Sequence, residues 1–413
     1  MICNMMHYFS PETSPLHGVR VIAIEHSVAG PLSSRMLGEL GAEVIKIERP
    51  GAGDFARHWD HNVAGESAQF WWLNSHKKSV ALDLKSESGR ATLDALLSDA
   101  DVVIHNLAPA SATRLGLGSD TLASKYPRLI NCQISGFGAD GPAADRKAYD
   151  MLIQAEAGLM SITGTPEQPM RVGVSISDVS TGLYAALLVL GALHERQRTG
   201  KGRYLDVAML DVSIEFFGPM LLSYANAGVV YPRIPDRHHA IAPYGVFECG
   251  DGGRILIAIE QDSEWQRFCL EVIKDPALAA HGSYSSNVDR VRHNDELATH
   301  LAEHFKRSSS VEILAALDAA DLAYAKINDV HDVLNHPVVG HRGIVETSAT
   351  SDGRPVVRHV GIAERIFGSE RERGTRPPKL GEHTEDVVNK LGADGDFTFD
   401  TAGVGRGKNN AQQ

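Results

Sequence analysis

One carboxylate in this chain occupies a position where it could do chemistry. Asp178 lies in the stretch GVSISDVSTGLYAALLVLGALHERQRTGKG, residues 173–202, whose nearly apolar part 183–193 predicts a buried helix. Ser180 or Thr181 is the expected cap that accepts the first backbone N–H groups of this helix. Asp178 would then lie just before the cap, where those groups and the helix dipole keep it ionised. An ionised, partly desolvated carboxylate can act as a nucleophile or a base, and helix capping alone is the structural alternative.

Four basic residues follow predicted strands of the same chain. They are Arg49, Lys85, Arg114 and Lys147. Ligands of open α/β sheets bind outside the carboxyl ends of the strands, so these cations could converge on a phosphate-bearing cofactor. Ordinary surface charge is the simpler explanation for any one of them.

The composition excludes several classes of protein. The chain has 413 residues, 43% hydrophobic and 22% charged, which is typical of a soluble enzyme with one large core or two moderate ones. Its net charge of −12 argues against a general nucleic-acid role. The longest apolar run, 182–193, is too short to cross a bilayer, and the N-terminus lacks a secretory pattern, so we expect a cytoplasmic protein without a membrane partner. The four cysteines are scattered without C-x-x-C spacing, which favours free thiols over disulfides or a zinc site.

Strand and helix patterns alternate through the first part of the chain. Strands are predicted at residues 19–25, 43–48, 79–84, 102–106 and 129–136, with helices at 32–41 and 86–100. This order predicts βαβ units and a mainly parallel sheet covered on both faces. The predicted fold class is therefore α/β, with a large Rossmann-like domain.

A smaller α+β domain is predicted after it. PYGVFECGDGGRILIAIE is typical of a hairpin that turns at residues 250–253, and helical patterns follow at 263–273, 309–320 and 380–392. The predicted limits are 16–225 for the amino-terminal part of the large domain, 240–330 for the small domain, and 340–400 for a segment returning to the large domain. Residues 1–15 and 401–413 are expected to be flexible tails.

Motifs of several other functions are missing or weak. The chain has no G-x-G-x-x-G after its first strand, no P-loop and no G-x-S-x-G, which removes the fingerprints of nicotinamide enzymes, P-loop nucleotide binders and many serine hydrolases. HLAEH, from His300 to His304, matches a zinc-peptidase pattern but lacks an evident third ligand. We interpret it as solvated helix surface and expect no metal.

The motifs together resemble the type III CoA-transferases, a family that includes formyl-CoA and carnitine CoA-transferases and the related α-methylacyl-CoA racemases. The resemblance begins at residue 16 with LHGVRVIAIEHSVAGPLSSRMLGELGAEVIKIERPGAGDFAR. It continues through NSHKKSVALDLKSESGR, KAYDMLIQAEAGLMSITG, GVSISDVSTG, RTGKGRYLDVAMLD and LGEHTEDV. Several long motifs in the same order are far more specific than one glycine pattern.

The resemblance implies roles for individual residues. Asp178 occupies the place of the family's nucleophilic aspartate, which is compatible with a position at a helix start. The positions that match the family's CoA site are Val28, Ala29, Arg49, Leu82, Lys85, Asn106, Leu107, Ala108, Arg114, Lys147, Tyr149 and Asp150. The family has phenylalanine and glycine where this chain has Leu107 and Ala108, so an adenine contact is expected to differ.

The resemblance also implies a reaction. CoA would pass from an acyl-CoA to a free carboxylic acid through an aspartyl mixed anhydride and an aspartyl–CoA thioester, with acyl-CoA as substrate and no permanently bound cofactor. The racemases use an aspartate at the same place but pair it with histidine in G-H-D, where this chain has Ala148, Tyr149 and Asp150. A tyrosine with a pKa of about 10 is a poor second proton-transfer group, which favours the transferase. A non-catalytic CoA-binding protein is the third alternative.

Family members form interlocked, ring-shaped homodimers, which we expect here as well. For the acyl group we expect a short dicarboxylate, with succinyl-CoA as a candidate donor; formate, oxalate, carnitine and aromatic acids stay open. A distal carboxylate would need a cationic partner. The stretch PRIPDRHH offers Arg233, Arg237, His238 and His239, and an exposed loop is the alternative there.

Overall fold

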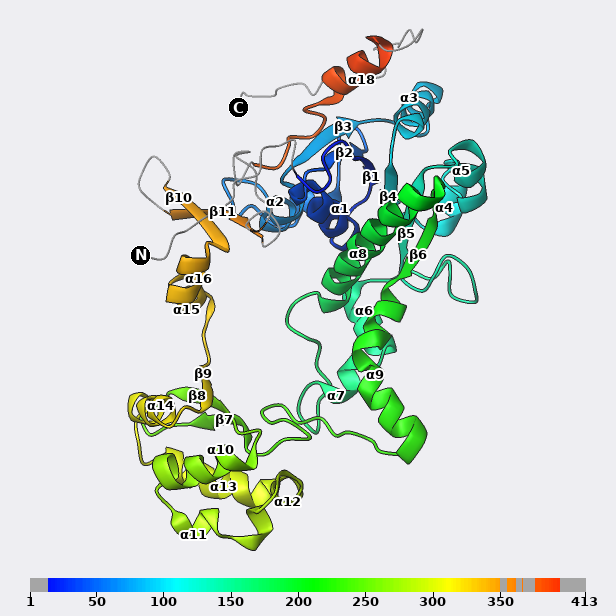
Figure 1. Ribbon diagram of the computed structural model, residues 1–413. Coiled ribbons are helices and arrows are strands. Elements are labelled where there is room, and N and C mark those ends of the chain that lie inside the picture. The colour runs from blue at the N-terminus through cyan, green and yellow to red at the C-terminus, as the bar shows by residue number, and fades with distance from the viewer. Residues whose placement is uncertain (1–13, 350–354, 362–365, 367–375, 394–413) are drawn as a thin grey trace. The chain divides into compact units, whose positions relative to one another are not determined.

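The computed structural model describes residues 14–349, 355–361, 366 and 376–393. The chain divides into two compact units, whose elements are labelled in Figure 1. Met1–Leu159, Val172–Pro219 and Pro337–Gln413 form the first unit, and Met160–Arg171 with Met220–His336 form the second. The predicted tails lie outside the described residues, apart from residues 14 and 15.

A six-stranded sheet forms the centre of the first unit. Its strands are β1 (Arg20–Ile24), β2 (Glu43–Glu48), β3 (Lys77–Ala81), β4 (Val102–His105), β5 (Ile130–Ser135) and β6 (Tyr204–Ala208). Their order is β3-β2-β1-β4-β5-β6, and every neighbouring pair is parallel. The predicted α/β fold with a parallel sheet is confirmed. The sequence analysis missed β6, whose largely exposed start lacks the apolar run of the inner strands.

Helices connect and cover these strands. Those that begin in the first unit are α1 (Ala29–Glu39), α2 (Ala68–Asn74), α3 (Glu87–Ser98), α4 (Pro109–Arg114), α5 (Ser119–Lys125), α6 (Asp150–Glu156), α7 (Leu159–Ile162), α8 (Ile176–Thr199), α9 (Met209–Ala227), α16 (Pro337–Arg342) and α18 (Thr384–Ala393), with a 3₁₀ turn at Phe55–His58. Helix α1 begins three residues before the predicted start, because Pro31 fits the first helical turn, where its missing N–H has no partner to lose.

Two apolar layers enclose the sheet, because successive side chains of a strand point to opposite faces. Val21 and Ile104 belong to the layer that contains buried residues of α1 and α8. Ile22 and Val103 belong to the opposite layer, with residues of α3, α4 and α5. Figure 1 shows α8 running alongside α1. The carboxyl ends of the strands thus lead into turns next to the beginnings of these helices.

Helix α8 is long and apolar enough to cross a membrane by length and composition, the one such helix among the described residues. Half of its most apolar 18-residue window is buried inside the fold. Ala185 and Val189 are fully buried in the layer beneath the sheet. The predicted apolar run 182–193 is therefore part of a longer core helix.

The second unit contains a small antiparallel sheet of β7 (Tyr244–Glu248), β8 (Arg254–Ala258) and β9 (Ala323–Lys326). The predicted hairpin at residues 250–253 is confirmed. Trp265, Phe268 and Phe305 fill the core on one face of this sheet. Its helical segments are α10 (Asp262–Arg267), a π-helical turn (Phe268–Ile273), α11 (Pro276–Ala279), a 3₁₀ turn (Gly282–Tyr284), α12 (Asn287–Arg292), α13 (Asn294–Phe305), α14 (Ser310–Ala319) and α15 (Val330–Leu334).

The C-terminal segment covers the free edge of the parallel sheet. A short hairpin, β10 (Val345–Ala349) with β11 (Pro355–Val360), precedes it. The N–H of Gly381 donates to Oγ of Ser79 (2.9 Å), and the N–H of Ala81 donates to Oγ1 of Thr384 (3.0 Å). Helix α18 then packs on β3 and α3. The LGEHTEDV motif thus protects edge strand β3 from pairing with other chains.

Candidate active site

Asp178 lies within the first turn of α8. The helix begins at Ile176, and its N-cap residue makes no side-chain hydrogen bond. The predicted caps are wrong, because Ser180 and Thr181 lie inside the helix. Their hydroxyls donate to the carbonyl oxygen of Ser177 (3.2 and 2.6 Å). The free N–H groups at this helix start therefore need another acceptor.

Asp150, the first residue of α6, supplies that acceptor. Its Oδ1 accepts the backbone N–H groups of Ser177 (2.9 Å) and Asp178 (3.3 Å). Its Oδ2 accepts Nε2 of Gln154 (2.7 Å), whose Oε1 accepts the N–H of Val172 (2.9 Å). The sequence analysis missed this cap, because Asp150 is 28 residues from Asp178 and no local pattern joins them.

The Asp178 carboxyl has a pKa raised to about 7. Burial is the largest cause, and the negative charge of Asp150 adds to it. Among the described residues, neither a hydrogen-bond donor nor a cation compensates the Asp178 carboxylate. The helix start therefore does not keep this group fully ionised near pH 7, because burial and the charge of Asp150 favour its protonated form.

Close packing of two helices brings Asp178 near the turn that follows β1. A Cβ on Gly182 would lie 2.8 Å from the carbonyl oxygen of Ala29, so only glycine allows α8 this close to α1. Val179, next to Asp178, packs against a cluster that contains Val28. Two predicted CoA-site residues, Val28 and Ala29, thus lie beside the start of α8.

The turn between β1 and α1, residues 25–28, is held by side chains from neighbouring loops. Nδ2 of Asn106 donates to the carbonyl oxygen of His26 (2.8 Å), and its Oδ1 accepts the N–H of His26 (3.1 Å). Ser27 has a φ of +71°, unfavourable for a residue with a side chain, and its N–H donates to Oδ1 of Asp54 (3.2 Å). Both polar ends of the Asn106 side chain therefore position this turn.

A buried ion cluster, formed by Glu25, Lys46, Asp54 and Lys77, holds the start of this turn and the first turn of α1. Nζ of Lys77 lies 2.8 Å from Oε1 of Glu25 and donates to the carbonyl oxygen of Pro31 (2.9 Å). Nζ of Lys46 lies 3.0 Å from Oδ2 of Asp54 and donates to the carbonyl oxygen of Glu25 (3.1 Å). All four charged side chains are fully buried. Burial lowers the pKa of Lys77 to about 7, although Glu25 opposes the shift.

Comparison with known proteins identifies the family. Residues 16–384 match CoA-transferase family III. The chain belongs to this family. It is 34% identical over 387 residues to the succinate–glutarate CoA-transferase of Agrobacterium fabrum, covering 91% of this chain and 96% of that protein. It is 32% identical to the human succinyl-CoA:glutarate CoA-transferase, over 91% and 86% of the two chains.

A solved structure agrees with this assignment. The crystal structure of a CaiB/BaiF family protein from Brucella suis matches this CoA-transferase with a TM-score of 0.79 and 32% sequence identity. The match covers 92% of this chain and 99% of that one. The predicted family and enzyme class are therefore confirmed, and the protein is a transferase.

The four predicted cations of the transferase are exposed at the carboxyl edge of the sheet or in loops that follow it. Arg49 directly follows β2, Lys85 lies between β3 and α3, and Lys147 precedes α6. Arg114 ends α4, where its Nη2 donates to Oγ of Ser111 (2.8 Å). Within the described part of the chain none of the four forms an ion pair, so their charges are available to an anionic ligand.

The remaining predicted CoA-site residues differ in exposure. Leu82 is buried, Leu107 is half-buried and Ala108 is exposed. The side chain of Tyr149, directly before α6, is 65% exposed.

The predicted cationic stretch lies in the second unit of the transferase, where its two arginines already have partners. Nε of Arg233 donates to the carbonyl oxygen of Thr165 (2.7 Å). Nη1 of Arg237 lies 2.9 Å from Oδ1 of Asp295. The His238 ring stacks on Tyr244. These residues therefore contribute to the structure of their own unit.

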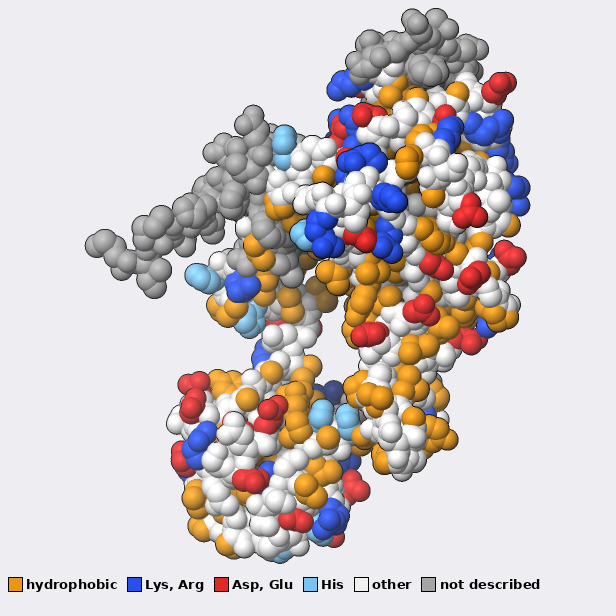
Figure 2. All heavy atoms as spheres, turned by 45° about the vertical axis from the view of Figure 1, so that its right-hand side comes forward, with side chains coloured by type: hydrophobic (Ala, Val, Ile, Leu, Met, Phe, Trp, Pro, Cys, Tyr) orange, Lys and Arg blue, Asp and Glu red, His pale blue; other side chains and the backbone are white. Residues whose placement is uncertain are grey.

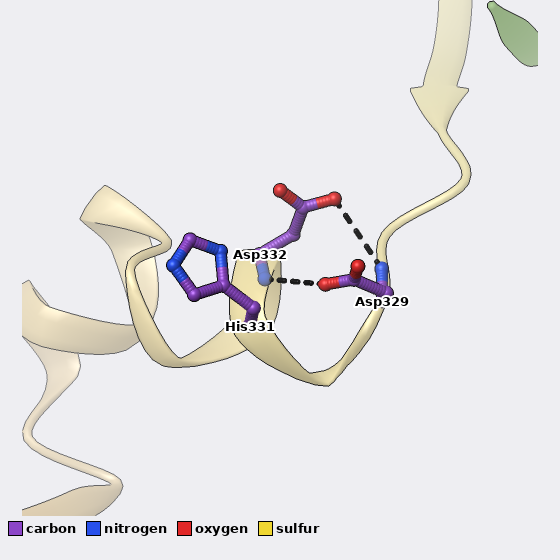
Figure 3. A group of neighbouring side chains, drawn as sticks. All are labelled: Asp329, His331 and Asp332. Carbon is purple, nitrogen blue, oxygen red and sulfur yellow. Dashed lines mark hydrogen bonds between the residues drawn. The ribbon is translucent and has the colours of Figure 1, made fainter.

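One group of metal-ligating residue types occurs in the described part of the transferase: Asp329, His331 and Asp332 (Figure 3). Asp329 and Asp332 form the capping box of α15, in which Asp329 accepts the N–H of Asp332 (2.8 Å). Oδ2 of Asp332 also lies 3.3 Å from Nζ of Lys326. Helix capping and an ion pair account for this group. His300 and His304 of HLAEH lie on α13, where His300 is exposed.

Proposed function

We propose that this transferase moves CoA from an acyl-CoA to a free carboxylic acid with Asp178 as the nucleophile, and that its substrates are short dicarboxylic acids, with succinyl-CoA as a donor. One observation carries the proposal: a half-buried carboxylate, without a cationic partner among the described residues, lies at the start of a core helix beside the β1–α1 turn. The names of the two relatives, which contain succinate or succinyl-CoA and glutarate, support the dicarboxylate class.

The reaction proceeds by exchange of thioesters and anhydrides. The Asp178 carboxylate attacks the thioester carbonyl of the donor, and the C–S bond breaks to release CoA thiolate and leave a mixed anhydride. The thiolate attacks the aspartyl carbonyl, which expels the donor carboxylate and leaves an aspartyl–CoA thioester. The acceptor carboxylate attacks this thioester, releasing thiolate and forming a new anhydride. Attack of the thiolate on the acceptor's acyl carbon then produces the new acyl-CoA and regenerates Asp178.

The electrostatics of Asp178 suit this role. A carboxylate with a pKa of about 7 is more basic than an exposed aspartate, and partial burial removes some of the water that would otherwise hydrate it. The same shift leaves only about half of the groups ionised near pH 7. Transfer is therefore expected to become faster as the pH rises through this value.

The proposed CoA site lies along the carboxyl edge of the parallel sheet. Arg49, Lys85, Arg114 and Lys147 would bind the phosphates, because their exposed side chains have no acidic partner among the described residues. The other proposed contacts are Val28, Ala29, Leu82, Leu107, Ala108, Tyr149 and Asp150. Asn106 acts by holding the β1–α1 turn. The reaction needs neither a metal nor a permanently bound cofactor.

We further propose that the transferase is a cytoplasmic, interlocked, ring-shaped homodimer. Figure 2 shows apolar side chains on the surface of the first unit. On α8 and the part of α9 in this unit, Leu183, Leu187, Leu188 and Phe216 are between 41% and 62% exposed. Contiguous exposed apolar surface is typical of an interface between proteins, and a second copy of the chain is the occupant we propose.

Mass spectrometry of CoA thioesters tests the function. Purified protein is mixed in deuterated water with a panel of acyl-CoA donors and free carboxylic acids. We expect succinyl-CoA and a second dicarboxylate to yield a new acyl-CoA, and we expect Asp178→Asn, nearly isosteric but a poor nucleophile, to abolish this product. Normal turnover by the variant, with deamidation excluded, would contradict the covalent mechanism. Deuterium gained at the α carbon of a 2-methylacyl-CoA, without exchange, would instead establish a racemase.

A further inference from the structure

The cap of α8 comes from another helix. A helix start needs only a hydrogen-bond acceptor, which serine, threonine or asparagine can provide without the net charge of aspartate. Here the acceptor is Asp150, which is 9% exposed and belongs to a different helix. Gln154, fully buried one turn further along α6, donates to its second oxygen (2.7 Å) and fixes the carboxyl plane. This arrangement places a second carboxylate next to Asp178, which raises the cost of ionising Asp178.

No other charge near α8 acts in this way. The charged residues on the elements that pack against α8 are Arg35 and Glu39 of α1, Asp206 of β6, Asp150 and Glu156 of α6, and Asp211 and Glu215 of α9. The two on α9 are exposed. Strand β5 has none. Arg35 pairs with Glu39, Glu156 pairs with Arg146, and Asp206 accepts a backbone N–H. Among the described residues, Asp150 is the one whose charge acts on Asp178.

We propose that Asp150 is a positioning residue for the transfer reaction: its hydrogen bonds to the amides of Ser177 and Asp178 fix the first turn of α8, and its negative charge keeps the Asp178 carboxylate basic enough to attack a thioester. This inference rests on the proposed function of Asp178. It gives the Asp150 carboxylate two separable roles, one geometric and one electrostatic. A neutral isostere retains the first role and removes the second.

The pH dependence of kcat/KM for the acyl-CoA separates these roles. The wild-type profile is expected to rise with pH through about 7, where Asp178 ionises. Asp150→Asn still offers an oxygen to both amides but removes the like charge, so the rising limb should move to lower pH by about one unit. The plateau should fall several-fold, because a less basic carboxylate is a weaker nucleophile. Asp150→Ala should move the limb equally and lower the plateau further, because the amides also lose their acceptor.

Two further variants complete the test. Glu156→Gln removes an exposed carboxylate from the same helix and should leave the limb in place. If Asp150→Asn does not fold, Gln154→Met provides the measurement: without its amide donor the Asp150 charge is less compensated, and the limb should move to higher pH. Titration of the CoA phosphates is common to all variants and cancels in the comparison.

Each outcome bears on the inference. If the rising limb of the pH profile of Asp150→Asn lies at the same pH as in the wild type, the electrostatic role is overturned. The same holds if the rising limb does not move in Gln154→Met. Equal plateaus in Asp150→Asn and Asp150→Ala would overturn the positioning role. Failure of the proposed function would look different, because wild-type protein would then form no new acyl-CoA at any pH.

Discussion

Two groups of buried charge in the first unit differ in how their carboxylates are compensated. In the buried ion cluster, Glu25 and Asp54 each lie within 3.0 Å of a lysine ammonium. At the start of α8, Asp150 receives only neutral amide donors, and among the described residues Asp178 has no compensating partner. The first group holds a turn, whereas the second contains the proposed nucleophile.

The difference shows how one protein uses buried charge in two ways. Opposite charges in the ion cluster partly offset the desolvation of each other, although burial still lowers the pKa of Lys77 to about 7. The two ammonium groups also donate to backbone carbonyls. The like charges at α8 leave desolvation unopposed, so the pKa of Asp178 rises to about 7. The uncompensated charge of Asp178 makes the folded protein less stable, and it also makes this carboxylate a more reactive nucleophile. Functional sites commonly show this trade-off between stability and activity.

The largest expected effect follows from removing one partner of the ion cluster. Lys77→Met leaves Glu25 without its nearest ammonium inside the fold, which should reduce the free energy of unfolding by about 3–5 kcal/mol. Urea unfolding followed by circular dichroism measures this loss. Lys78→Met is the matched control on the same strand, where a partly exposed lysine pairs with Glu43 and its removal should cost less than about 1 kcal/mol. Equal losses in the two variants would show that the cluster is not a special stabilising feature.

The opposite result is expected for the uncompensated carboxylate. Between about pH 4 and pH 7 the folded chain keeps a proton on Asp178 that the unfolded chain releases, so this group removes stability as pH rises through that window. Asp178→Asn has no such cost and should be more stable than wild type at pH 8 by at most about 4 kcal/mol. The difference in urea unfolding should vanish near pH 4. A difference that is constant with pH would indicate a packing effect and contradict the charge argument.

The smallest effect is expected at a second helix start with two carboxylates. At α15, Asp329 is exposed and Asp332 is half-buried near the surface, so their mutual repulsion is screened by water. Asp329→Ala should lose about 1 kcal/mol of local stability, seen as roughly fivefold faster hydrogen exchange of the α15 amides. Added Zn²⁺ should leave the wild-type exchange rates unchanged. Protection that depends on Zn²⁺ would instead reveal a metal site.

Particular residues show where sequence analysis succeeded. Strand β2 was predicted at its observed limits, because the alternation and apolar content of EVIKIE are local properties. The hairpin of β7 and β8 was predicted from the glycines of its turn. Asp178 was selected from its place before an apolar helix. The start of α8 was wrong, because its capping acceptor comes from α6, which no sequence window around Asp178 contains.

The sequence by itself determined the α/β class, the position of Asp178 at a helix start and the family, because apolar periodicity and ordered motifs depend only on neighbouring residues. The tertiary structure decided the electrostatics: which carboxylates meet ammonium groups and which meet each other. Whether a side chain is desolvated, and which charge lies beside it, depends on segments far apart in the chain. That is why the sequence predicted an ionised Asp178 and the fold raised its pKa to about 7.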